Sequence, residues 1–327
     1  MSAARSPGFA RTRRMPFIWL IRVGVSALML TLIFTFVPFA SVWAAARQFS
    51  PGLWLAALCL FIAGHAAAAA KWRLLIGGGI SYRQAFRAHL AGLAANLALP
   101  GVAGGDVVRA GLVMGKAHDK GRLAVGSLAD RVLDTLGLVL IALAGAYAAW
   151  RPEMDAGPGW AWILLAALAL VACAFPAVPA LDRMLKRREV TGKVSRMIGK
   201  MVSATADLMQ QPARLFLCLG ISMLIQCLFV GINIAFARAA HVDAPIAAWF
   251  FAWTTAKIIA IAPISLGGLG VREASMAGLL RPFGADPGQV VAIGLIWQSV
   301  LYASGAIGFI VQLQRPSPGT PKTERAQ

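Results

Sequence analysis

The sequence predicts an all-α polytopic integral membrane protein with six full spans and two re-entrant helical hairpins, eight hydrophobic segments arranged as an inverted repeat. Three observations predict this fold. Of the 327 residues, 59% are hydrophobic and only 13% are charged, whereas soluble domains carry roughly 25% charged residues. Several uncharged runs exceed the roughly 20 residues that a helix needs to cross a bilayer. A motif that interrupts the apolar pattern recurs at half the chain length.

The first half contains two crossings, a hairpin and a third crossing. Basic residues in 1–16 predict a cytoplasmic N-terminus, because positive loops stay inside. Spans 17–45 and 51–75 follow, and the first has an apolar run too long for a cleaved signal peptide. The apolar stretch 88–115 has basic residues on both flanks. A re-entrant hairpin keeps both flanks in the cytoplasm, and span 123–150 then crosses outward.

The second half repeats this order. For its basic cytoplasmic loop, an amphipathic helix on the anionic membrane surface and an ordinary solvated loop remain alternatives. The hairpin of this half enters from outside, and the polar tail is expected to be cytoplasmic and disordered. The expected elements are span 157–181, loop 182–212, span 213–240, hairpin 245–283, span 287–313 and tail 314–327.

The interruption in each apolar hairpin has the same pattern, P-x-x-x-G-G-x-x-x-R. The first copy ends at Arg109 and the second at Arg272, so the offset is 272 − 109 = 163 residues, half of the chain. The same offset superimposes the flanking spans. We therefore expect a single transmembrane domain, 17–313, built from repeats 17–150 and 157–313. Broken helices at equivalent positions of inverted repeats mark the substrate site of transporters.

The two motifs supply the candidate substrate-binding residues. A proline ends one arm, a glycine pair allows the chain to turn, and the next half-helix begins with free N–H groups that suit an anion. An arginine one turn into that helix reinforces the preference. The candidates are Arg109, Arg272, Gly104, Gly105, Gly267, Gly268, Asp106 and Glu273.

Four further charges lie inside apolar segments, and we assign them to gating or ion pairing: Asp130, Asp134, Arg131 and Lys257. Intramembrane charges are costly and normally face a partner or a cavity. Asp130 and Asp134 share a helix face, so they are placed to pair with Arg109 and Arg272 across the repeat interface. A structural ion-pair network is the alternative to a substrate site.

The sequence also bounds the chemistry. It contains no nucleophile motif, no histidine pair with metal-ligand spacing and no phosphate-binding loop for ATP, so we expect no catalytic residue, metal or cofactor. The net charge of +18 gathers beside the apolar spans. This placement favours membrane lipids over nucleic acid as partners. The four cysteines all lie in apolar spans and are expected to be small core residues.

Three stretches carry a family resemblance: "NLALPGVAGGDVVRAGLVMG", "ADRVLDTLGL" and "APISLGGLGVREASMAGLL". They resemble the membrane-embedded, flippase-like domain of lysylphosphatidylglycerol synthases, over about 17–313. The resemblance implies that a lipid, often one with a modified headgroup, moves between leaflets, and some relatives act in hopanoid or other isoprenoid-lipid pathways. The bifunctional synthases carry a soluble aminoacyl-transferase domain after the membrane part. This sequence ends in a short tail, so we do not expect it to make lysyl-lipid.

The expected function is therefore that of a lipid translocase for a phospholipid or an isoprenoid or modified-headgroup lipid. The expected location is a bacterial-type cytoplasmic membrane, with both termini cytoplasmic. An intramembrane lipid-linked transferase and a non-catalytic scaffold of a lipid-synthesis complex remain alternatives. Lipid-biosynthesis enzymes and a second copy of the chain are compatible partners.

Overall fold

The part of the chain that the structure describes is entirely helical. The computed structural model describes residues 49–98, 103–115, 119–149, 193–261 and 269–314, with isolated positions before 49. These ranges contain nine α-helices, one short 3₁₀ helix and no strand. The all-helical prediction is confirmed for them. Apart from those isolated positions, the predicted spans 17–45 and 157–181 lie outside the described residues, as does the tail after 314.

Four helices are long and apolar enough to cross a membrane, and they coincide with four of the six predicted spans. A proline opens three of them, a position where its missing N–H costs nothing. Side-chain caps start two: Ser50 Oγ accepts the N–H of Leu53 at 3.1 Å and Asp286 accepts that of Gln289 at 2.9 Å. The four are α3 (Pro51–Leu75), α6 (Lys120–Ala149), α9 (Pro212–Ala239) and α12 (Pro287–Leu313).

Between the long helices lie two pairs of short ones. The first pair is α4 (Tyr82–Ala98) and α5 (Ala103–Met114), and the second is α10 (Ile246–Ile259) and α11 (Val271–Leu280). At 1.5 Å per residue, α5 and α11 measure only about 18 Å and 15 Å, against a hydrocarbon core of about 30 Å. Each pair occupies the place of a predicted hairpin. A 3₁₀ turn, η1 (Arg281–Phe283), follows α11.

Helix α4 begins at Tyr82, earlier than the predicted start at 88. The sequence signal is a capping box, which the apolar pattern alone did not reveal. The backbone N–H of Ser81 donates to Gln84 Oε1 at 3.0 Å, and that of Gln84 donates to Ser81 Oγ at 3.3 Å. These reciprocal bonds satisfy two donors that a helix start otherwise leaves unpaired, so the helix begins within the basic flank.

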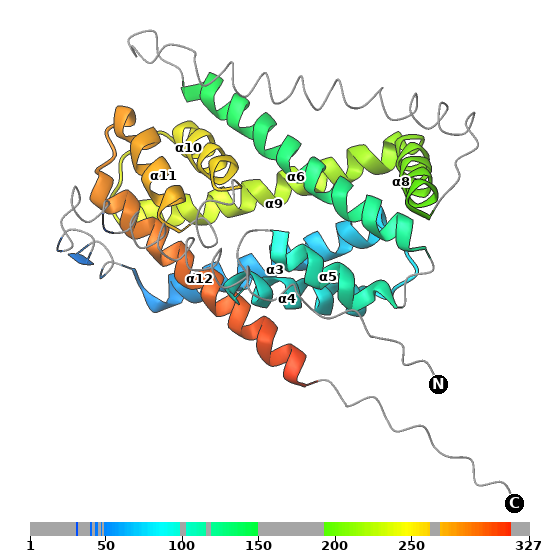
Figure 1. Cartoon of the computed structure of the whole chain (residues 1–327). Coiled ribbons are helices and arrows are strands. Elements are labelled where there is room, and N and C mark those ends of the chain that lie inside the picture. Colours follow the sequence, from blue (N-terminus) through cyan, green and yellow to red (C-terminus); the bar gives the residue numbers. More distant parts are fainter. Residues whose placement is uncertain are drawn as a thin grey trace, which may run out of the picture.

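Each half packs one of its two short helices against a long helix of the other half. The first half runs long, short, short, long (α3, α4, α5, α6), and the second repeats this order (α9, α10, α11, α12). Helix α4 packs against α12 of the other half, and α10 packs against α6. In Figure 1 the α4–α5 pair lies low in the picture with α12 beside it, and the α10–α11 pair lies at the upper left. The duplication in the sequence therefore has a counterpart in the packing.

The equivalent helices α3 and α9 pack antiparallel. Phe61 of α3 stacks on Phe229, with ring centroids 5.0 Å apart. Further along α3, Lys71 Nζ donates to Ser222 Oγ of α9 at 2.7 Å. Residue numbers thus rise along α3 as they fall along α9. Two equivalent helices that point in opposite directions are what a two-fold axis perpendicular to both would produce.

Equivalent glycines allow helices of opposite halves to approach closely. Gly145 of α6 and Gly308 of α12 are separated by the repeat offset, 308 − 145 = 163. A methyl group built at Gly145 would lie 2.6 Å from the backbone nitrogen of Phe251 in α10. One built at Gly308 would overlap the carbonyl oxygen of Leu90 in α4. Only glycine lets the backbones meet at these crossings.

The core between the halves is aromatic. Rings of Phe61, Phe229, Trp253 and Trp297, one from each of α3, α9, α10 and α12, lie with centroid separations from 5.0 to 6.4 Å. Such edge and stacked pairs add to the burial energy. The basic loop contributes helix α8 (Lys193–Met209), whose Leu208 is buried beside α6 and α9. Its C-terminal part therefore packs against protein.

Candidate functional site

Six charged side chains meet where α3, α5 and α6 come together. Three are cations and three are carboxylates, so the group is neutral as a whole. Its members, called here the six-charge cluster, are Lys71, Arg109, Arg131, Asp106, Asp130 and Asp134.

Asp130 is the centre of the six-charge cluster. One carboxylate oxygen lies 3.0 Å from Lys71 Nζ and the other accepts a hydrogen bond of 3.0 Å from Arg109. Asp130 and Arg109 are each 2% exposed and Lys71 is fully buried. Lys71 also contacts Asp134, one turn along α6. The i,i+4 spacing of the two aspartates places both on the face that meets α3.

Arg109 links the cluster to its surroundings. It lies 3.2 Å from Asp106, one turn earlier in α5, and Asp106 also pairs with Arg131. Its guanidinium carbon lies 4.5 Å from the ring centroid of Trp72, a cation–π distance. A second nitrogen lies 3.2 Å from Nδ1 of His89. The arginine of the first motif is thus held on every side by protein.

A histidine pair extends this chain of hydrogen bonds. Arg109 can only donate, so Nδ1 of His89 accepts, and its proton sits on Nε2. That nitrogen lies 2.9 Å from Nδ1 of His65, which must then accept as well. The directions of both bonds follow from the arginine alone, and they require both rings to be neutral while the chain is intact.

The α4–α5 hairpin is closed by a backbone-to-backbone approach. Gly105 faces Gly92, and a methyl group on either would collide with the other's carbonyl oxygen. The N–H of Gly105 donates to Asn96 Oδ1 at 2.9 Å. Gly104, the other glycine of the motif, is partly buried in the first turn of α5. The first N–H groups of α5 are therefore turned toward α4, and one of them is already bonded.

The second motif forms a smaller cluster. Arg272 pairs with Glu273, its neighbour in α11, and donates to Gln298 Oε1 of α12 at 3.0 Å. Glu273 is fully buried, and its other oxygen accepts the N–H of Gly270 at 2.7 Å. The glutamate thereby caps the start of α11. Gly267 and Gly268 of this motif lie outside the described residues.

Lys257 stands apart from both clusters. It lies in the last turn of α10, just before the second motif, and is partly exposed. Its Nζ donates to Gln226 Oε1 of α9 at 2.8 Å and lies 4.9 Å from the ring centroid of Trp253 and 5.5 Å from that of Phe229. Among the described residues no carboxylate lies within 4.0 Å of it. The nearby groups are an amide and aromatic faces.

The structure thus brings the candidates of the first half together and keeps those of the second half separate. Asp130 pairs with Arg109, whereas Arg272 pairs with an acid on its own helix. Lys71 was treated as part of a basic flank, although two acids one turn apart on the facing helix required a cation. Gln298 was not among the candidates either. A single amide in an apolar span is a weak signal, because interhelical hydrogen bonds are common there.

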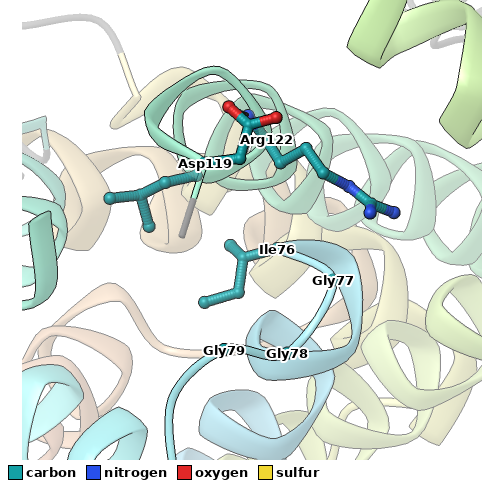
Figure 2. A pocket seen from close by; sticks show the side chains of 7 residues that line it. Ile76, Gly77, Gly78, Gly79, Asp119 and Arg122 are labelled. Carbon is teal, nitrogen blue, oxygen red and sulfur yellow. Dashed lines mark hydrogen bonds between the residues drawn. The ribbon is translucent and has the colours of Figure 1, made fainter. Parts of the chain in front are cut away.

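A pocket lies away from these charges, where the loop after α3 meets the start of α6. It holds about 100 Å³ and is lined by residues 76–79 together with Asp119, Arg122 and Leu123, as Figure 2 shows. The carboxylate of Asp119 accepts the N–H groups of Gly121 and Arg122, so it caps α6. No member of the six-charge cluster lines this pocket. In the described ranges no three His, Cys, Asp or Glu side chains gather to hold a metal ion.

Comparison with known proteins agrees with the fold and with the motifs. A search of curated proteins finds no match. The family model described as the lysylphosphatidylglycerol synthase TM region matches residues 19–308, which includes both motifs, the long helices α3, α6 and α9, and most of α12. The match covers most of the 327 residues, and it points to a multi-pass membrane protein with a lipid-related role. The chain belongs to the lysylphosphatidylglycerol synthase transmembrane-region family.

Proposed function

We propose that the protein is a lipid translocase, which moves a phospholipid or an isoprenoid or modified-headgroup lipid between leaflets. The observation that carries the proposal is the packing of one short helix of each half against the other half. Helices α4 and α10, each too short to cross the membrane, lie against long helices of the opposite half, with charges buried in the structure beside them. Buried charges beside the short helices would give a headgroup polar partners as it crosses, while the acyl chains stay in the bilayer. The family membership supports a lipid as the substrate.

We further infer that the halves are inverted repeats and that both hairpins are re-entrant. The antiparallel packing of α3 on α9 supports inversion, and the lengths of α5 and α11 support re-entrance. Single cysteines placed in 116–122 and 281–286, in a background without the native cysteines, test both. With cytoplasmic termini, an impermeant reagent applied outside should label 281–286 and spare 116–122. The reverse pattern would contradict the topology.

Translocation itself is measured with the full chain reconstituted in vesicles that contain a headgroup-labelled fluorescent lipid. An impermeant reductant bleaches the outer leaflet. If the protein exchanges lipid, vesicles that contain it lose signal from both leaflets, whereas empty vesicles stop at about half, because lipids alone rarely cross the apolar core. No excess loss for any lipid class would contradict a translocase. An energy requirement appears as dependence on a proton or ion gradient.

A matched pair of variants connects the activity to the hairpin. Gly105→Ala pushes a methyl group into the carbonyl of Gly92, whereas Gly111→Ala lies on the same helix in open space. We expect the first to slow translocation and the second to leave it unchanged. Asn96→Ala removes the acceptor of the Gly105 N–H and adds no atoms. This variant replaces Gly105→Ala in the test if Gly105→Ala does not fold.

The same assay separates the alternatives. A lipid-linked transferase would change the chemical identity of the labelled lipid, which mass spectrometry of the vesicle lipids detects. A scaffold would bind lipid-synthesis enzymes and leave both leaflets unmixed, and Gly105→Ala would not alter that binding if the fold survives. We propose the translocase because the buried charges lie beside the short helices, where a headgroup would pass.

A further inference from the structure

Lys257 is a partly buried cation, and the described residues place no carboxylate beside it. The six-charge cluster holds three cations and three carboxylates, and Arg272 is matched by Glu273. Adding Lys257 gives this interior a net charge of +1. An isolated charge within an apolar segment is costly, and buried charges are normally paired.

The helix end does not supply the missing negative charge. A cation in the last turn of a helix can interact with the free carbonyls there. Side chains in a helix lean toward its N-terminus, however. The Nζ of Lys257 accordingly lies over Trp253, one turn earlier in α10, at 4.9 Å from the ring centroid. The ammonium therefore points away from the carbonyl end of α10.

A donor of the neighbouring Trp253 has no acceptor among the described residues. The indole Nε1 of Trp253 is buried without a hydrogen-bond partner, and the side chain is 1% exposed. An ammonium carries three N–H donors, and within the described ranges Lys257 has a single acceptor, Gln226 Oε1. Buried donors without partners are rare and costly. Lys257 and Trp253 thus both offer hydrogen-bond donors, and a ligand with one negative charge would balance the net charge of +1.

We propose that Lys257 and Trp253, with Gln226 positioning the lysine, form a binding site for the phosphate oxyanion of a phospholipid headgroup. The inference rests on the proposed function, and it names the substrate class as anionic. A phosphate diester carries one negative charge and several acceptor oxygens, which match the net charge and the spare donors. The aromatic rings of Phe229 and Trp253 form apolar walls beside the ammonium. Lys257 is partly exposed, so a headgroup can reach it.

The test measures lipid binding apart from translocation. The full chain is placed in nanodiscs of phosphatidylcholine with or without phosphatidylglycerol, and bound lipids are counted by native mass spectrometry. We expect Lys257→Met to weaken phosphatidylglycerol binding about tenfold, because a charge-assisted hydrogen bond is lost, and to weaken phosphatidylcholine binding less, because its choline group offsets the charge of the same phosphate. Lys257→Arg should keep most of the preference. Lys120→Met, which removes an exposed lysine, is the matched control.

Each outcome decides the proposal. Equal phosphatidylglycerol binding by wild type and Lys257→Met overturns it, as does loss with Lys120→Met alone. Displacement of the lipid by inorganic phosphate, dependent on Lys257, would assign the site to soluble anions and overturn the lipid source. We expect Lys257→Met to keep the thermal stability of the wild type, because the removed charge offsets the lost bond to Gln226; loss of binding at equal measured stability then does not come from a failure to fold. Trp253→Phe gives a second, charge-neutral variant and should weaken binding by a smaller factor.

Failure of this inference and failure of the proposed function are distinguishable. If wild type mixes the leaflets but shows no anionic preference, the translocase stands and the Lys257 site falls. If wild type binds phosphatidylglycerol through Lys257 and does not mix the leaflets, the site stands and the translocase falls.

Discussion

The two halves share their helix order and their packing, but they solve the problem of a buried arginine differently. In the first half two of the three acids sit on the long helix, at Asp130 and Asp134, and the third, Asp106, lies on the short helix beside Arg109. The repeat offset places Ile293 and Trp297 at the two long-helix positions in the second half. There the acid is Glu273, next to the arginine on the short helix, and its counterpart in the first half is Ala110. The arginine and its hairpin are thus duplicated, whereas the acids that balance the charge of each arginine lie at different positions in the two halves.

The difference has a functional consequence. The first half uses its charges to join three helices, and its cluster is neutral and closed. The second half pairs its arginine within one helix, with one further bond to Gln298, and no carboxylate of the described residues lies beside Lys257. One half is suited to hold the structure, and the other keeps a positive charge available.

The largest effect is expected from a substitution in the six-charge cluster of the first half. Asp130→Ala removes the carboxylate between Lys71 and Arg109 and leaves two buried cations with one acid fewer. Breaking a buried pair from one side costs about 3–5 kcal/mol, so the free energy of unfolding should fall by that amount or little folded protein should be obtained. Thermal challenge followed by fluorescence-detected size-exclusion chromatography measures it. Asp207→Ala, at an exposed position of α8, is the control. Equal stability of both variants would show that the cluster does not hold the first half together.

The sequence predicted the framework well because membrane helices carry strong signals. Apolar length gave the four long helices, and the repeated motif gave the positions of both short pairs. The start of α4 was missed, because an apolar pattern does not register a capping box at Ser81 and Gln84. To locate a helix that starts in a polar flank, a membrane sequence must also be searched for capping boxes.

The site was predicted in part, for a physical reason. Charge type and spacing identified Arg109, Asp130 and Arg272, but partners depend on which helices meet. Nothing in the residues near Lys71 distinguishes a basic flank from a buried counter-ion. Because α4 packs against α12 and α10 against α6, the arginines lie in separate clusters, which sequence spacing alone did not reveal.

The second prediction concerns the two equivalent helix crossings at Gly145 and Gly308. If the packing is duplicated, equivalent substitutions at the two crossings should have similar effects. Gly145→Ala and Gly308→Ala each force a methyl group into the opposing backbone, and such overpacking costs about 1–3 kcal/mol. We expect similar falls in thermal stability for both variants. Gly231→Ala, at an exposed position of α9 with open space around it, should be neutral or slightly stabilising. A large effect at one crossing only would contradict the symmetry.

A third, smaller effect concerns the pairing in the second half. Gln298→Leu removes the acceptor of the 3.0 Å bond from Arg272, while Glu273 still compensates the charge. The cost should be about 1–2 kcal/mol, that of one buried donor losing its partner, and well below that of Asp130→Ala. Urea or thermal unfolding in detergent compares the two, with the exposed Gln210→Leu as control. If Gln298→Leu matched Asp130→Ala, compensation in the second half would not be local to α11.

The smallest effect separates the two halves most sharply, because it compares two tryptophans of equal burial. Trp72 is fully buried and its indole N–H donates to Ser127 Oγ at 2.9 Å, whereas the N–H of Trp253 has no partner. Replacement by phenylalanine removes the same atoms from both. Trp72→Phe loses a hydrogen bond worth about 1 kcal/mol, although Ser127 keeps its own bond to the carbonyl oxygen of Leu123, while Trp253→Phe relieves an unsatisfied donor. Without added anionic lipid, Trp253→Phe should therefore unfold at a higher temperature than Trp72→Phe. Added phosphatidylglycerol should narrow this gap, because it gives the wild-type Trp253 the acceptor that the variant cannot use. A gap that stays constant with lipid would mean that the spare donor of the second half is not part of a binding site.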